Sequence, residues 1–404
     1  MIVNDKNSTN LKWPFFCILV DVKKLYIYYP IFFFYLSFSG QNLSSNSTGS
    51  FTYTPNSPLN NQPVDVYYHI PEGEISTMPI VFSFHGAARN ADNYRDFWIS
   101  MADENSFIVI APEFSSDYYP ELGDDYLMGN VYIDGDNPTP ESRNPENEWT
   151  FSIIDPLFDA IVDDIGGNQT MYKAWGHSGG AQFLHRLLLF LPDSRLEVAV
   201  CSNAGWYTVP EFGISFPYGL DNSEISDSNL INIFSSNLIV HLGENDNNPN
   251  SAGLRHNNVL DNQQGLNRFE RGNYFFDFSM SFAEEMNTTF NWELHTVPNT
   301  GHNGQQMAND ALSHLLASNL NLNNSSYSDF KVFPNPSNDQ IFFNNNRLYF
   351  HKIEVFDLIG QSIVLRTNIN TNSNSISLKA LNPGTYLVIF SNDKEKNVFK
   401  IIKN

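Results

Sequence analysis

Cysteine is scarce in this chain of 404 residues, which contains only Cys17 and Cys201. Cys17 lies in an N-terminal segment that we expect to be removed, so one cysteine is left. A single cysteine forms neither a disulfide framework nor a cysteine metal site. The compartment must therefore be inferred from targeting signals.

Positive charge is also scarce, with 22 Lys and Arg against 44 Asp and Glu and a net charge of −22. All of the excess negative charge lies in residues 41–328, since the segments before and after it are net positive. An acidic chain repels nucleic-acid phosphates and anionic lipids, so we expect no nucleic-acid partner and a protein kept soluble outside the cell by its charge.

Long apolar runs are absent as well. The run Leu25–Phe38 is shorter than the about 18 residues of a membrane span and contains Pro30. Two lysines precede it and small residues follow it before Gly40, as in a signal peptide. The sequence predicts a signal region at 1–39, with Val22 as a candidate start of translation, and no stable membrane span; an uncleaved anchor is the alternative.

The rest of the chain divides by composition. Residues 40–60 are rich in Ser, Asn, Thr and Pro and are predicted to be a flexible leader. Residues 61–318 alternate strand-like and helix-like segments, which predicts the α/β class: a mostly parallel sheet with helices on both faces. Residues 319–328 resemble a linker in composition, and residues 329–404 contain short strand-like runs that predict a small all-β sandwich.

The segments expected in residues 61–318 follow from periodicity. The expected strands are Val64–Ile70, Ile80–Phe84, Phe107–Ala111, Met171–Trp175, Val198–Cys201, Asn237–Leu242 and Asn291–Val297. The expected helices are Asn90–Glu104, Ile153–Ile165, Ala181–Leu191, Phe275–Met286 and Gln306–Leu320. Residues 113–149 have no clear elements, and so long a stretch is typical of a lid or a binding loop.

Residues 176–180 read Gly-His-Ser-Gly-Gly, a G-x-S-x-G pattern between a predicted strand and a predicted helix. This setting predicts a nucleophile elbow, in which Ser178 is exposed on a strained turn and the glycines avoid collisions with neighbouring backbone. The Gly179 N–H then points toward an oxyanion at the helix N-terminus. The alternative is a Gly-rich turn with an ordinary serine.

A second oxyanion donor is expected after the strand Ile80–Phe84, where the sequence continues His-Gly-Ala-Ala. Hydrolases with a nucleophile elbow place a backbone N–H at this turn. Ala87 is the candidate donor and Ala88 the second choice, against the alternative of a plain strand-to-helix turn.

The other two members of a catalytic triad are expected downstream. Asp246 follows the strand Asn237–Leu242, and Glu244 is the alternative acid. His302 follows the last predicted strand, which completes the order Ser, Asp, His. We interpret four further histidines as packing or surface residues: His177, His185, His295 and His314.

This chemistry predicts no metal and no cofactor. His302 takes the proton of Ser178, and Asp246 orients the imidazole. Residues 134–137 are predicted to form a solvated turn, with a structural calcium loop as the alternative, because the distal bidentate acid of an EF-hand loop is missing. Trp206 and Tyr207 follow a strand on the carboxyl side of the sheet and are predicted to bind substrate, with core packing as the alternative.

On Ser178, Asp246, His302 and the segment HGAARN, residues 64–318 resemble α/β-hydrolases related to polyhydroxyalkanoate depolymerases and secreted esterases. The segments NADNYRD at 90–96 and QQGLNRFERG at 263–272 are similar to that group as well. The resemblance implies a serine hydrolase of carboxylic esters, with a polyester as one candidate substrate.

The end of the chain resembles a C-terminal sorting domain of the type IX secretion system. The resemblance rests on VFPNPS at 332–337, IEVFDLIGQ at 353–361 and LNPGTYL at 381–387. It implies passage through the periplasm, export by that machinery as a partner, and a secreted or surface-attached product.

Two alternative functions stay open. One is a serine peptidase of the same fold, although no large gating domain fits before the first predicted strand. The other is a non-catalytic surface protein that uses the fold as a binding scaffold, which the sorting tail favours and the three triad residues disfavour.

Overall fold

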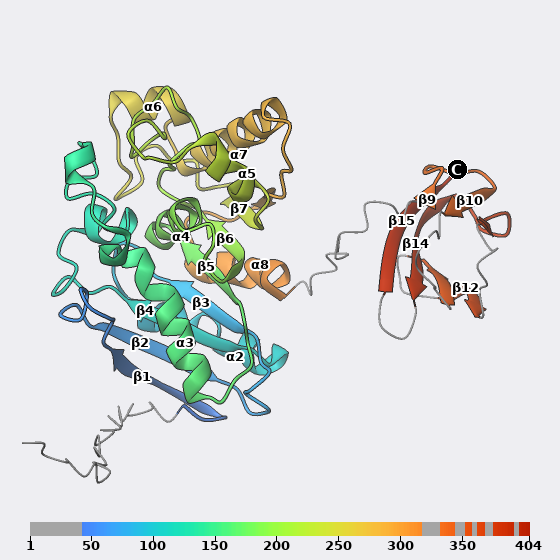
Figure 1. The fold of residues 1–404 in the computed structure, drawn as a ribbon, viewed down its shortest axis with the longest axis horizontal. Coiled ribbons are helices and arrows are strands. Elements are labelled where there is room, and N and C mark those ends of the chain that lie inside the picture. The colour runs from blue at the N-terminus through green and yellow to red at the C-terminus, as the bar shows by residue number, and fades with distance from the viewer. Residues whose placement is uncertain (1–42, 317–331, 344–351, 358–361, 368–374, 392–395) are drawn as a thin grey trace, which may run out of the picture. The chain divides into compact units, whose positions relative to one another are not determined.

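The computed structural model describes residues 43–316, 332–343, 352–357, 362–367, 375–391 and 396–404. The predicted signal region 1–39 and linker 319–328 lie outside these residues. Residues 43–316 are built on one eight-stranded sheet in the order β1-β2-β4-β3-β5-β6-β7-β8 (Figure 1). The strands are β1 Ser47–Tyr53, β2 Val64–Ile70, β3 Ile80–Phe84, β4 Ile108–Glu113, β5 Tyr172–His177, β6 Leu196–Ser202, β7 Leu238–Gly243 and β8 Glu293–Val297.

The strand directions match the predicted class. β2 pairs antiparallel with β1 and with β4, and all pairs from β4 to β8 are parallel. Both faces of the sheet are buried, since successive side chains of β3 enter different cores: Val81 lies in one cluster and Phe82 in the other. This explains why β3 is a continuous apolar run.

Helices cover the two faces (Figure 1). The core around Trp98 and Trp175 is closed by α1 Ala91–Asp96, α2 Ile99–Asn105 and α8 Gly304–Leu316. The larger core on the other face is closed by α3 Ile154–Asp164, α4 Gly179–Phe190, α5 Asp227–Phe234 and α7 Arg268–Glu285, with α6 Asn258–Gln264 beside α7.

Two predictions from the sequence need correction. The leader predicted at 40–60 is wrong over Ser47–Tyr53, which forms β1 and extends the sheet, because its backbone pairs along the whole of β2. The single helix expected at 90–104 is two helices, α1 and α2. The break brings Trp98 into the core, where its Nε1 donates to Ser83 Oγ at 3.1 Å.

The stretch at 113–149 contains short helical turns. A π-helix spans Leu122–Leu127, and 3₁₀ turns span Pro140–Ser142 and Glu146–Glu148; a further 3₁₀ turn, Thr150–Ile153, comes directly after the stretch. Tyr126 from this stretch donates to the backbone oxygen of His85 at 2.8 Å, which fixes the stretch beside the end of β3.

The C-terminal part is the small β-structure expected from the sequence. A sheet in the order β13-β10-β9 and a sheet in the order β12-β11-β14-β15 share one core, where the Phe343 and Phe390 rings lie 4.9 Å apart. The strands are β9 Val332–Phe333, β10 Gln340–Phe343, β11 Lys352–Phe356, β12 Ser362–Thr367, β13 Ser375–Ser377, β14 Gly384–Ser391 and β15 Lys396–Lys403.

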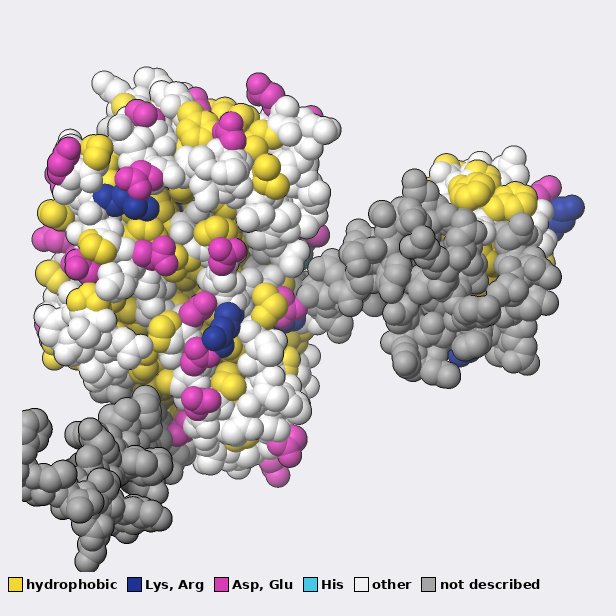
Figure 2. Space-filling model, viewed as in Figure 1, with side chains coloured by type: hydrophobic (Ala, Val, Ile, Leu, Met, Phe, Trp, Pro, Cys, Tyr) yellow, Lys and Arg dark blue, Asp and Glu magenta, His cyan; other side chains and the backbone are white. Residues whose placement is uncertain are grey.

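Within the described ranges, no helix is both long and apolar enough to cross a membrane. Acidic side chains are scattered over the face of residues 43–316 seen in Figure 2, whereas basic ones appear there only in a few small groups. This distribution agrees with the excess of acids in the sequence.

Candidate active site

Ser178 lies at the turn between β5 and α4, as the elbow pattern predicts. Its backbone has φ 59° and ψ −114°, a strained conformation for a residue with a side chain. A Cβ on Gly176 would lie 2.3 Å from the Gly180 oxygen, and one on Gly180 would lie 2.0 Å from the Phe84 oxygen. Only glycine fits at both positions, so the turn depends on them.

The structure brings Ser178, His302 and Asp246 together. His302 Nε2 is 3.1 Å from Ser178 Oγ, and His302 Nδ1 is 2.6 Å from Asp246 Oδ2. The three residues come from the carboxyl ends of β5, β7 and β8, which meet at one edge of a parallel sheet. His302 is about one third exposed, so its ring can be reached from outside.

The two candidate acids have different surroundings. Asp246 is almost fully buried, and Arg268 Nη1 lies 3.4 Å from its Oδ1. Glu244 instead accepts a hydrogen bond from Thr296 Oγ1 at 3.1 Å. Asp246, and not Glu244, contacts His302. Arg268 was not singled out in the sequence, although it lies in the segment QQGLNRFERG.

The two candidate oxyanion donors lie next to each other. Gly179 is the first residue of α4, where backbone N–H groups have no acceptor within the helix. A Cβ on Gly179 would lie 3.1 Å from the Ala87 nitrogen. The Ser178 N–H is already used, because it donates to the Ser202 oxygen at 2.9 Å.

His177 lies buried against His302, with ring centroids 4.5 Å apart. Burial, and then the neighbouring imidazole of His302, hold the pKa of His177 well below its usual range. His177 therefore stays neutral and adds no positive charge beside His302. Cys201 is buried in the core, and burial raises the pKa of its thiol, so this side chain is not a reactive nucleophile.

A cavity of about 210 Å³ opens beside Ser178, Gly179 and Ala87. Leu122 and Leu127 form part of its wall, so the stretch at 113–149 contributes to the site as expected. Two arginines, Arg255 and Arg268, line the cavity, and no acidic residue does. This basic lining contrasts with the acidic chain around it.

The two aromatic residues predicted to bind substrate are separated by the structure. Trp206 lines the cavity and packs against Arg186, whose guanidinium carbon is 3.9 Å from the ring centroid. Tyr207 does not line it; the ring is fully buried and stacks on Phe275 at 4.5 Å. The prediction for Tyr207 is therefore wrong, because its ring packs in the core against Phe275 and not in the cavity.

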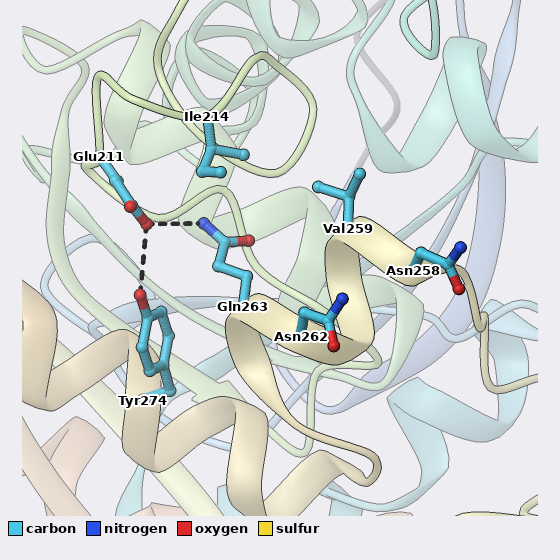
Figure 3. A pocket seen from close by; sticks show the side chains of 7 residues that line it. All are labelled: Glu211, Ile214, Asn258, Val259, Asn262, Gln263 and Tyr274. Carbon is cyan, nitrogen blue, oxygen red and sulfur yellow. Dashed lines mark hydrogen bonds between the residues drawn. The ribbon is translucent and has the colours of Figure 1, made fainter.

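Another hollow, of about 510 Å³, lies between α6, α7 and the loop around Glu211 (Figure 3). Glu211 accepts hydrogen bonds there from Gln263 Nε2 at 3.0 Å and from Tyr274 Oη at 3.2 Å. The residues that line this hollow include no serine, cysteine or histidine, whereas Ser178 lines the smaller cavity.

The calcium loop considered at residues 134–137 has other partners. Arg255 forms a bidentate ion pair with Asp136, at 2.6 and 2.9 Å. Asp134 accepts hydrogen bonds from Asn137. These carboxylates are held within the protein, and Asp136 positions an arginine of the cavity wall.

A mostly parallel sheet with this strand order and a serine at the β5–α4 turn defines an α/β-hydrolase. A similar solved structure is poly(aspartic acid) hydrolase-1 from Sphingomonas sp. KT-1, with 34% identity, coverage of 67% of this chain and 99% of that chain, and a TM-score of 0.62. LpqC, a poly(3-hydroxybutyrate) depolymerase from Bordetella parapertussis, has 26% identity, coverage of 67% and 90%, and a TM-score of 0.62. The chain belongs to the α/β-hydrolase family of poly(aspartic acid) hydrolase-1.

Residues 331–404 match the family model of the secretion system C-terminal sorting domain. The resemblance seen in the tail is thereby confirmed, and the protein is secreted or held at the cell surface. No match was found among curated protein sequences.

Proposed function

We propose that this protein is a serine hydrolase that cleaves carboxylic esters, with Ser178 as nucleophile, His302 as base and Asp246 as the acid that orients it. The observation that carries the proposal is the hydrogen-bonded chain from Ser178 Oγ through His302 to Asp246, with separations of 3.1 and 2.6 Å. The family membership supports the same chemistry.

In the proposed reaction, Ser178 Oγ attacks the ester carbonyl carbon while its proton passes to His302 Nε2. The oxyanion accepts hydrogen bonds from the Gly179 and Ala87 N–H groups, each contributing about 3 kcal/mol in comparable sites. As the intermediate collapses, the alcohol leaves with the proton from His302. Water then attacks the acyl-enzyme by the same route and releases the acid.

The proposed organisation is a signal region at 1–39, a catalytic domain that includes β1 and ends near residue 318, a linker at 319–328 and a sorting domain at 329–404. The signal region supports entry into the periplasm, and the sorting domain supports export by the type IX machinery.

A second candidate function is cleavage of amide bonds in an anionic polymer. Arg255 and Arg268 in the cavity wall favour it, because guanidinium groups bind carboxylates well. The 34% identity to a poly(aspartic acid) hydrolase also supports an anionic substrate.

The decisive experiment compares wild type with Ser178→Ala on p-nitrophenyl butyrate and with a fluorophosphonate probe. Loss of turnover by about 10⁴-fold or more and loss of labelling are expected, whereas Ser116→Ala at an exposed site should change neither. Turnover that survives Ser178→Ala would refute the assignment. A wild-type protein that neither turns over esters nor reacts with the probe would favour a non-catalytic binding scaffold.

A substrate panel separates the two candidate functions. Short esters, a solid polyester and poly(aspartic acid) would be compared by kcat/KM under the same conditions. Faster cleavage of poly(aspartic acid) than of any ester would favour the amide-cleaving candidate, and faster cleavage of dipeptide amides would favour a peptidase.

A further inference from the structure

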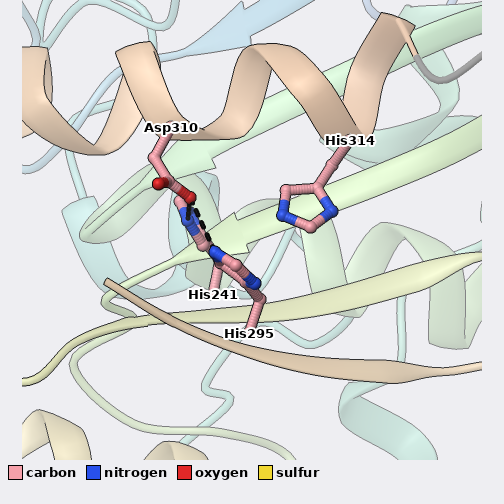
Figure 4. A group of neighbouring side chains, drawn as sticks. All are labelled: His241, His295, Asp310 and His314. Atoms are coloured by element: carbon pink, nitrogen blue, oxygen red, sulfur yellow. Dashed lines mark hydrogen bonds and ion pairs between the residues drawn. The ribbon is translucent and has the colours of Figure 1, made fainter. Parts of the chain in front are cut away.

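Four metal-ligating side chains lie together on the face of the sheet that α8 covers (Figure 4). They are His241 on β7, His295 on β8, and Asp310 and His314 on α8. One ligand atom from each lies within 4.8 Å of those of the other three. None of these residues lines the cavity beside Ser178.

The fold places these residues by regular geometry. His241 and His295 are direct partners in the parallel pairing of β7 and β8. Val240 and Leu242 point to the other core, so His241 points toward α8. Asp310 and His314 are four residues apart on α8 and share one face of that helix.

The hydrogen bonds around His241 leave one nitrogen directed into the cluster. Its Nδ1 is 2.7 Å from Ser202 Oγ, which also accepts from Trp175 Nε1 at 2.8 Å. Its Nε2 lies 3.0 Å from Asp310 Oδ1, and His295 Nε2 lies 2.9 Å from the same oxygen. Metal-ligating histidines are typically anchored through one ring nitrogen and bind the ion through the other, which in His241 is Nε2, the nitrogen that now contacts Asp310.

His314 supplies an independent observation. Its Nε2 is buried and has no hydrogen-bond partner among the described residues.

We propose that His241, His295, Asp310 and His314 bind one divalent transition-metal ion, with Zn²⁺ as the occupant that fits best. Three imidazoles and one carboxylate suit Zn²⁺, and tetrahedral bonds of about 2.0–2.1 Å place neighbouring ligand atoms about 3.3 Å apart. The distances from Asp310 Oδ1 to the Nε2 atoms of His241 and His295 are already near this value. The wider separations between ligand atoms must shorten by at most about 1.5 Å, which half-buried side chains achieve by small rotations.

The metal has a structural role in this proposal. Four protein ligands leave no coordination position for substrate or water. The ion would join β7, β8 and α8, and these elements flank two residues of the triad: Asp246 follows β7, and His302 lies between β8 and α8. Metal binding is expected to stabilise this end of the sheet without taking part in the reaction.

The test uses the secreted full-length protein after dialysis against EDTA. Titration with Zn²⁺ should show one ion bound per chain, and the melting temperature should rise by about 5 to 10 °C when Zn²⁺ is at 100 times its dissociation constant. His314→Gln, which removes a nitrogen with no other partner, should weaken binding by about 100-fold or more. His256→Gln is the matched control, because His256 hydrogen-bonds to Asp261 outside the cluster.

Bound Co²⁺ gives a second readout, since tetrahedral Co²⁺ absorbs strongly in the visible and His314→Gln should lose that spectrum. Circular dichroism and the melting temperature in EDTA report whether the variant folds as wild type does. Absence of stoichiometric Zn²⁺ binding by wild type, or equal binding by His314→Gln, would overturn the metal site. Esterase activity in EDTA is measured separately, so a failure of the metal site can be distinguished from a failure of the proposed function.

Discussion

Asp246 and Glu244 lie two residues apart after β7, but only Asp246 contacts His302. Asp246→Asn keeps the shape of the side chain and removes the charge that stabilises the imidazolium, so kcat should fall by about 10³- to 10⁴-fold. Glu244→Gln should lower kcat less than about threefold, because Glu244 bonds to Thr296 outside the triad.

The measurement is steady-state hydrolysis of p-nitrophenyl butyrate, with the melting temperature of each variant as a check on folding. A larger loss in Glu244→Gln than in Asp246→Asn would reverse the choice of acid.

Trp206 and Tyr207 allow a matched pair of substitutions. Trp206→Ala should raise KM for octanoate esters about tenfold more than for acetate, because its ring lines the cavity. It should also destabilise the fold by about 3 kcal/mol, since Trp206 is only 3% exposed. Tyr207→Phe preserves the stack on Phe275 and should leave every KM unchanged.

Kinetics are recorded well below the melting temperature of Trp206→Ala, so that unfolding of the variant does not affect the measured KM. Equal KM changes for short and long esters would show that Trp206 does not bind the substrate.

The residues of the candidate site differ in how far the sequence reveals them. Ser178, Asp246 and His302 each follow a recognisable strand, so their meeting follows from the parallel order of strands. Arg255 carries no such signal, because it lies in an irregular segment and its place depends on the ion pair with Asp136. The metal-binding cluster was missed for a similar reason: an Asp and a His four apart are common on helices, and only strand pairing adds His241 and His295.

At the scale of elements, the elbow depends on the approach of α4 to β3. Gly180→Ala would place a Cβ 2.0 Å from the Phe84 oxygen, so it should cost about 3 kcal/mol or more and reduce activity through displacement of Ser178. Gly213→Ala is the control, because a Cβ there meets nothing within 4 Å. Thermal unfolding and ester turnover measure both effects, and a Gly180→Ala protein as stable and active as wild type would contradict the close approach.

Strand β1 yields a prediction about the start of the catalytic domain. A chain that begins at residue 61 lacks β1 and the buried Leu43, whose N–H donates to Asp164 Oδ2 at 2.7 Å. It should be less stable by about 4 kcal/mol and melt about 10 °C lower than a chain that begins at residue 43. Equal melting temperatures would show that residues 43–60 are a leader that the fold does not need.

The sequence predicts a helix or strand correctly where the segment's own residues show the pattern. The strands Val64–Ile70 and Ile80–Phe84 are confirmed at their predicted bounds. Strand β1 was missed because its sequence STGSFTY has only two large apolar residues, and the pairing with β2 holds it. Helices α5 and α6 were missed because they are short and because their stability comes from packing against other helices: α5 contacts α4 and α7, and α6 contacts α7.

At the scale of the whole molecule, the sorting domain and the catalytic domain have separate hydrophobic cores. A chain that lacks residues 331–404 should keep the kcat/KM of the full chain within about twofold, since the described residues that line the cavity all belong to the range 43–316. In a bacterium with the type IX system, the truncated chain should accumulate in the periplasm. Immunoblots of cell fractions and turnover assays test both statements, and efficient export without the tail would contradict the second.

The contact between Gly180 and the Phe84 carbonyl also bears on how this protein can evolve. A crowded side chain is relieved when its neighbour mutates to a smaller residue, but every residue type carries a backbone carbonyl, so no second mutation makes room. The cavity wall, by contrast, includes side chains that can be exchanged, such as Leu122, Leu127 and Trp206. Descendants of this protein are therefore free to acquire new substrates, while the position of the nucleophile is inherited unchanged.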